Sequence, residues 1–200
     1  VDSVRGYLLS IDPQTDNTTI LNPLQVEAWQ DATGIATSDD KIWFTKGHEV
    51  FYCDRTSLAP TKFAQLPYPI DGIAVWQSVV YVTCQKSGYI HIFEQSTGQR
   101  ITRFPQPGIG IENITVVDDE LWVCDRTEQT IYCMDRATGA VRLSVLTPFP
   151  NPTGLSFYPH PSGEGRLLYV VYANEEPYIR DDPNAESPYQ LTFRDRTFIH

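Results

Sequence analysis

The chain has 200 residues, of which 41% are hydrophobic and 12% aromatic, and its formal net charge at pH 7 is −10. This composition favours a folded domain with a sizeable core over a disordered chain. It argues against nucleic-acid binding, which needs a basic surface to neutralise phosphates, and no apolar run approaches the about 20 residues needed to cross a bilayer.

The first residues, VDSVRGYLLSID, do not have the features of a signal peptide. They contain no initiator Met, no basic start and no long apolar stretch. We therefore expect a soluble chain of unknown cellular location, which is a processed product or a piece of something longer. The four cysteines include no CxxC pair, so neither a zinc site nor a disulfide scaffold is expected.

Short runs of β-branched and aromatic residues follow one another along the chain, and Gly, Pro, Asp or Ser bounds each of them. We predict a first pair of strands, a helical turn around Leu24–Trp29 after Pro23, three groups of four strands, and a last pair. The first pair is Gly6–Ile11 and Thr18–Leu21, and the last is Thr153–Phe157 and Arg166–Ala173, separated by the inserted turn YPHPSGEG. The three groups are Gly34–Thr37, Ile42–Thr45, Glu49–Asp54 and Thr61–Leu66; Gly72–Trp76, Val79–Cys84, Tyr89–Glu94 and Gln99–Phe104; and Asn113–Val117, Leu121–Asp125, Thr130–Asp135 and Ala140–Leu146.

Two sequence markers recur with a period of about 40 residues. An acidic residue closes the third strand of each group at intervals of 40 to 42 residues, and a second marker opens each first strand at intervals of 38 to 41. The acidic marker is at Asp12, Asp54, Glu94 and Asp135, and the opening marker is at Gly34, Gly72, Asn113 and Gly154. Four short antiparallel strands repeated in this way predict an all-β fold of β-propeller blades, four to five in number.

Particular stretches resemble known propeller repeats. The segment VYVTCQKSGYIHIFEQSTGQRI, at positions 80–101, is similar to the YVTN repeat, and PIDGIAV and NPTGLSF are similar to the opening of NHL-type repeats. The resemblance spans about residues 6–175 and implies blade architecture without specifying a function. Cys84 and Cys124 stand where the family has Asn, and Asn113 where it has Gly.

The two ends of the chain leave the number of blades open. If the first and last strand pairs share one sheet, the chain closes into a ring of four blades. Alternatively, Pro177–Asp181 and Tyr189–Arg194 complete a separate last blade, and the chain is a fragment of a larger propeller or multidomain protein, which we favour. We divide the chain into repeats over residues 1–175 and an acidic, proline-rich segment with a last strand over residues 176–200.

Polar residues at the entry to the innermost strands are candidate metal ligands. Asp71, Glu112 and Asn113 would lie around one opening, and their oxygens suit Ca²⁺ or another divalent cation. The chain also resembles, more weakly, the gluconolactonase propellers, which implies such a metal at the axis. The alternative, which we favour, is that these are solvated or hydrogen-bonded residues at strand entries, because the other two blades have Thr33 and Thr153 at this level.

Other conspicuous residues are expected to be structural. Trp43, Tyr81, Trp122 and Tyr169 occupy equivalent second-strand positions, which indicates packing between blades. A two-residue turn at Glu128–Gln129 would put Cys124 opposite Cys133, where a disulfide is conceivable, although two small buried side chains are the favoured interpretation. No Ser, His and Asp form a recognisable nucleophile motif.

These features predict a non-catalytic binding or scaffold domain for a protein or polymer ligand, with protein partners favoured by the acidic surface. One alternative is a divalent-metal-dependent, lactonase-like hydrolase with its site at the mouth of the axis. Another is a structural repeat segment of a larger assembly, whose partner is the remainder of a longer chain.

Overall fold

A computed structural model of the chain describes residues 4–12, 15, 17–22, 26–38, 40–160 and 165–173. These residues form an almost entirely β structure, in which three four-stranded and two two-stranded sheets are all antiparallel. The described part contains one short α-helix, α1 (Val26–Trp29), and one 3₁₀ turn, η1 (Gln85–Ser87). No described helix has the length and apolar character to cross a membrane.

The strands follow each other in chain order within each sheet, with every strand paired to the next one along the chain. The first sheet is β1 (Leu9–Ile11) and β2 (Thr18–Ile20), and the last is β15 (Pro152–Pro159) and β16 (Arg166–Tyr172). Between them lie β3 (Ala32–Thr37), β4 (Lys41–Lys46), β5 (Glu49–Asp54) and β6 (Thr61–Gln65); then β7 (Gly72–Trp76), β8 (Val79–Cys84), β9 (Tyr89–Glu94) and β10 (Arg100–Pro105); then β11 (Ile111–Val117), β12 (Glu120–Asp125), β13 (Thr130–Asp135) and β14 (Val141–Leu146).

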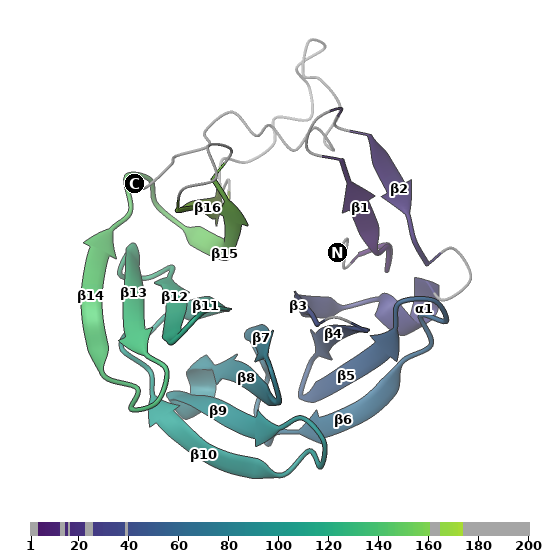
Figure 1. Cartoon of the computed structure of the whole chain (residues 1–200), viewed down its shortest axis with the longest axis horizontal. Coiled ribbons are helices and arrows are strands. Elements are labelled where there is room, and N and C mark those ends of the chain that lie inside the picture. The colour runs from purple at the N-terminus through teal and green to yellow at the C-terminus, as the bar shows by residue number, and fades with distance from the viewer. Residues whose placement is uncertain are drawn as a thin grey trace.

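The sheets are arranged radially around a common centre (Figure 1). Strands β3, β7, β11 and β15 lie nearest the centre, and β6, β10 and β14 lie at the perimeter. The predicted all-β repeat of four antiparallel strands is confirmed for the three central sheets, and several strand boundaries, such as Glu49–Asp54 and Thr130–Asp135, match the prediction residue for residue.

The core is divided into clusters that lie between consecutive sheets. Trp43 and Val50 of one sheet pack against Ile73 and Val82 of the next, and the opposite face of that next sheet packs its Tyr81 against the following sheet. Two further clusters join Leu8, which immediately precedes β1, and α1 to β3–β6, and the last sheet to β11–β14. A four-stranded sheet has two apolar faces, and stacking against two neighbours buries both of them.

The innermost strands approach each other closely where a glycine opens the strand. A Cβ on Gly72 would lie 2.9 Å from the Cα of Asn113 on the neighbouring strand, and a Cβ on Gly34 would lie 3.1 Å from a methyl carbon of Ile73. Crowding of backbones near the axis, the expected reason for the glycine marker, therefore holds at Gly72, whereas at Gly34 the nearest atom is the hydroxyl oxygen of Thr45 at 2.9 Å and the backbone N of Ile73 lies at 3.3 Å.

The structure contradicts two of the alternatives about strand pairing, neither of which was the favoured one. The strand pairs β1–β2 and β15–β16 form separate sheets, so the ring of four blades that requires them to share one sheet is wrong for the described residues. The register of β12 and β13 places Cys124 opposite Ile131 and Trp122 opposite Cys133, because the turn between these strands is four residues long and not two. All four cysteines are buried and free.

The predicted strands Pro177–Asp181 and Tyr189–Arg194, and the acidic segment that contains the first of them, lie outside the described residues. Half of the inserted turn YPHPSGEG, residues 161–164, also lies outside them. The helical turn predicted around Leu24–Trp29 is found as α1 over its last four residues.

Candidate functional site

The predicted metal ligands lie at the end of the innermost strands where β7 and β11 begin. Asp71 immediately precedes β7, and Glu112 and Asn113 are near the start of β11. The two strands are neighbours, because the backbone of Gly72 lies against Glu112 and Asn113. The structure thus brings the three predicted residues into one region.

Asp71 and Glu112 each have a protein partner in this region. The Asp71 Oδ2 atom accepts a hydrogen bond of 2.7 Å from the backbone N–H of Gln85. Glu112 Oε1 lies 3.7 Å from the guanidinium of Arg126. Burial raises the pKa of Asp71, the N–H of Gln85 opposes this shift, and the negative charge of Glu112 adds to it.

The threonines at the equivalent positions are also hydrogen bonded. The hydroxyl of Thr33 lies 2.9 Å from that of Thr45 and donates to the carbonyl of Ile70 at 3.2 Å. Thr153 donates to the carbonyl of Val171 at 3.4 Å. Within the described ranges, no three His, Cys, Asp or Glu side chains are grouped so that they could hold a metal ion. Two carboxylates and one amide are a sparse set for Ca²⁺, which takes about six to eight oxygens.

The opposite end of the innermost strands carries a groove that the sequence did not reveal. A cavity of about 170 Å³ is lined by the last residues of β7, β11 and β15 and by the first residue of β16, namely Trp76, Val116, Val117, Phe157, Tyr158, Pro159 and Arg166. A second hollow of about 430 Å³ shares Val117, Phe157 and Arg166 with it and continues to Glu120, Trp122 and Gly165. We call these two adjoining hollows the Trp76–Arg166 groove.

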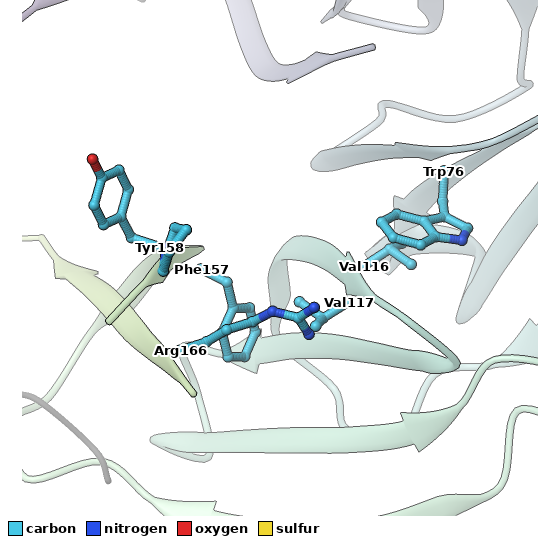
Figure 2. A pocket seen from close by; sticks show the side chains of 7 residues that line it. Trp76, Val116, Val117, Phe157, Tyr158 and Arg166 are labelled. Atoms are coloured by element: carbon cyan, nitrogen blue, oxygen red, sulfur yellow. The ribbon is translucent and has the colours of Figure 1, made fainter. Parts of the chain in front are cut away.

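Side chains from three sheets form this groove. In Figure 2, Trp76 stands on one side and Phe157 with Arg166 on the other, while Val116 and Val117 lie between them. The ring of Tyr158 points away from the others. The ring of Trp122 meets that of Phe157 edge to face, with centroids 5.4 Å apart.

The charged residues of the groove are held by ion pairs and hydrogen bonds. Arg166 contacts both carboxylate oxygens of Asp118, at 2.5 and 3.2 Å, which lowers the pKa of Asp118 and raises that of Arg166. Glu120 accepts a hydrogen bond of 2.9 Å from the indole N–H of Trp122. The guanidinium of Arg166 has five N–H donors, and its fork to Asp118 uses two of them.

Three of the four recurring second-strand aromatics pack between sheets, as expected, whereas Tyr169 contacts Tyr158 of its own sheet, with ring centroids 6.4 Å apart. Trp43 and Tyr81 are buried in the clusters between sheets, and Trp122 packs against the last sheet. The sequence did not reveal Trp76, Phe157 and Arg166, because the equivalent positions in the other repeats carry different residue types. The positions four residues after the opening markers of β7, β11 and β15 are Trp76, Val117 and Tyr158, and the large side chains at two of them are a signal for Trp76, but no repeat position marks Phe157 or Arg166.

No protein-family profile matches the chain, and no curated protein sequence matches it. The resemblance to YVTN and NHL repeats therefore remains one of local motifs.

The fold is similar to that of several solved structures. A computationally designed protein, Ika4, is 12% identical with a TM-score of 0.54, over 70% of this chain and 84% of that one. The glutaminyl cyclase of Myxococcus xanthus is 14% identical with a TM-score of 0.55, over 70% of this chain and 67% of that one. A chain of a nidogen/laminin complex is 13% identical with a TM-score of 0.59, over 74% of this chain and 57% of that one. At these identities the similarity concerns the fold alone.

Proposed function

We propose that the chain is a β-propeller that binds a protein ligand through the Trp76–Arg166 groove and catalyses no reaction. The propeller is supported by the radial arrangement of the sheets, the period of about 40 residues and the similarity to solved structures of the same fold. Sheets packed face to face around a centre need no other core, and they expose loops at both ends of the innermost strands.

The observation that carries the binding proposal is the composition of the groove. Its walls come from separate sheets and present Trp76, Trp122, Phe157 and Arg166, together with two valines. Tryptophan, tyrosine and arginine are the side chains most enriched where interfaces gain their binding energy. The groove is the better candidate for a protein ligand, because it presents large apolar side chains beside an arginine, whereas the other end of the strands presents two carboxylates and one amide.

A library of random peptides displayed on phage tests this proposal. We expect selected peptides to bind the wild-type chain and to lose at least tenfold in affinity for Val117→Phe, because the larger ring fills the groove. The matched control is the double change Asp71→Asn and Glu112→Gln at the opposite end, which should leave binding unchanged. The proposal would be contradicted if the selected peptides bound Val117→Phe as tightly as the wild type while circular dichroism showed that both variants are folded.

A second candidate function is metal-dependent hydrolysis of a lactone by a site that includes Asp71, Glu112 and Asn113. The observation in its favour is that Glu112 is near enough to Asp71 to raise its pKa, because a cation at this point would relieve the repulsion. This proposal predicts that Ca²⁺ raises the melting temperature of the wild type and not that of the double variant. Equal melting temperatures with Ca²⁺ and with a chelator would count against it.

A third candidate is a structural role as a repeat segment of a larger assembly. It is supported by the length of some structures with this fold: the chain covers 57% of the nidogen/laminin chain that it matches. The last sheet also exposes an apolar side chain, Val171 at 53% exposure, which a neighbouring repeat of a larger assembly would cover.

A further inference from the structure

The outermost strand of the third four-stranded sheet, β14, is an apolar edge. Leu143 is 49% exposed and Leu146 is 77% exposed. Arg142 is the only charged residue of this strand. Within the described residues, β14 is the last strand of its sheet, and Figure 1 shows it at the perimeter. An exposed, apolar edge strand is a template for pairing with another strand.

The hydrogen-bonding pattern of β13 and β14 determines which backbone groups of β14 point outward. The N–H of Thr147 donates to the carbonyl of Gln129 at 2.8 Å, and the same register pairs Ile131 with Val145 and Cys133 with Leu143. In an antiparallel ladder, hydrogen-bonded and non-hydrogen-bonded pairs alternate. The backbone N–H and C=O groups of Ser144 and Leu146 therefore point away from β13, towards the free edge.

The equivalent outer strand β10 is protected against such pairing. There the N–H of Gln106 donates to the carbonyl of Gly88 at 2.9 Å, so by the same alternation Arg103 and Pro105 face outward. Proline has no N–H to donate, and a two-fold pairing centred on Arg103 would place two arginines opposite each other. The edge of β14 has neither of these features.

We propose that β14 pairs antiparallel with β14 of a second copy of the chain, around a two-fold axis at Ser144. A two-fold axis perpendicular to the sheet leaves each side chain on the same face of the sheet in both copies. Because side chains alternate between the faces along a strand, an even-numbered residue must pair with an even-numbered residue, and an odd-numbered one with an odd-numbered one. An axis at Ser144 meets this condition, because it pairs Ser144 with Ser144. The backbone N–H and C=O of each Ser144 face outward, so each N–H donates to the C=O of the other copy.

This register is complementary in its side chains as well. It places Leu143 of each copy opposite Val145 of the other, which covers part of the exposed apolar surface of both strands. It places Arg142 opposite Leu146 of the other copy, so that the aliphatic part of the arginine covers the most exposed leucine of the strand. A bulge at Arg142 ends the regular ladder there.

No like charges oppose each other in this arrangement. The guanidinium of Arg142 is already paired with Asp119 at 3.0 Å and lies 3.5 Å from Glu120. It also contacts Asp135. Between the copies as wholes, however, the net charge of −10 on each chain is repulsive. Added salt screens this repulsion and should strengthen the dimer.

Sedimentation equilibrium from about 1 to about 500 µM, a range that brackets weak protein interfaces, tests the proposal. We expect the mass to rise from 22.7 kDa towards twice that value with concentration, and to rise further at higher salt. Ser144→Pro removes an N–H that faces only the second copy, and should keep the chain monomeric at every concentration. The matched control is Arg103→Pro on β10, which should leave dimerisation unchanged.

A second pair of variants keeps the proposal testable if a proline variant does not fold. Leu143→Lys on β14 should weaken the dimer at least tenfold, and Ile101→Lys at the 59% exposed position of β10 should not. Amide hydrogen exchange at Ser144 should slow as concentration rises. A constant mass, a dimer that survives Leu143→Lys, or a Ser144 amide equally protected at every concentration would overturn the proposal.

Discussion

The indole ring of Trp29 stacks on the phenyl ring of Phe44 with centroids 4.1 Å apart and an angle of 22° between the planes. Both side chains are fully buried, and Phe51 stacks on Phe44 at 5.2 Å. Trp29 belongs to the short helix and Phe44 to β4. The stack therefore fixes the helix against the first four-stranded sheet, where its four residues would not be stable alone.

Replacing Phe44 by alanine should lower the free energy of unfolding by about 3 to 5 kcal/mol, because it leaves a cavity between two aromatic rings. Urea denaturation followed by tryptophan fluorescence measures this loss. Ile101→Ala, at an exposed position of β10, should cost no more than about 0.5 kcal/mol. Similar losses in the two variants would mean that the stack contributes little.

Replacing Gly72 by alanine should destabilise the protein by about 1 to 3 kcal/mol, because the new methyl group would press on the backbone of Asn113. Gly154 opens the innermost strand of the last sheet, and a Cβ there would have its nearest neighbour, on Val171 of the paired strand, at 3.3 Å. Gly154→Ala is therefore the matched control, with a smaller expected loss. Thermal denaturation of both variants checks the difference, and the prediction fails if Gly154→Ala is the more damaging change.

His91 should make stability depend on pH between about 4 and 6.5. Burial, together with the charges of Arg100 and Arg103, lowers the pKa of this histidine from 6.5 to about 4, and its Nε2 lies 3.1 Å from the hydroxyl of Ser87. The unfolded chain binds the proton more readily in this interval, so stability is present above pH 6.5 and is lost as the pH falls towards 4.

Urea midpoints measured between pH 4 and pH 7.5 test this dependence in the wild type and in His91→Gln. The variant should be less stable at neutral pH, because the glutamine does not reproduce the packing of the ring, and it should show a shallower slope below pH 6.5. Equal slopes would assign the pH dependence to other groups.

The four cysteines should be unreactive in the folded protein. Burial is the main cause that raises the pKa of Cys53 to about 11 and the pKa of Cys124 and Cys133 to about 12, so these three side chains carry almost no thiolate at pH 8. Cys84 is fully buried, so a reagent cannot reach it in the folded protein. Ellman's reagent should react rapidly with all four thiols in denaturant. In buffer, no thiol of the native protein should react at a comparable rate. Rapid reaction of any native thiol would show that its sheet opens readily.

The strands could be predicted from the sequence because the chain repeats itself. Alternating β-branched and aromatic residues, bounded by turn residues, located Gly72–Trp76 and Tyr89–Glu94 without error. The roles of Trp43 and Tyr81 followed from their equivalent positions, since one residue type at one place in every blade indicates packing between blades. Because the same pattern occurs in several repeats, each of these predictions rests on several independent examples of it.

The groove and the pairing of the cysteines could not be predicted in this way. The groove joins Trp76, Val117 and Arg166, which lie in three different sheets and differ in type from one repeat to the next. The position of Cys124 depends on the length of one turn, and a change of two residues in that turn moves its partner from Cys133 to Ile131. Both features depend on local departures from the repeat.

The division of the core into clusters between consecutive sheets has a consequence for how the molecule opens. The sheet β7–β10 is buried on both faces by neighbours, through Val82 on one side and Ile90 on the other. In proteins whose units contact only adjacent units, stability is a sum of unit and interface terms. Native-state fluctuations should therefore begin in the described first and last sheets and spread inward, with β8 and β9 the slowest to exchange their amide hydrogens.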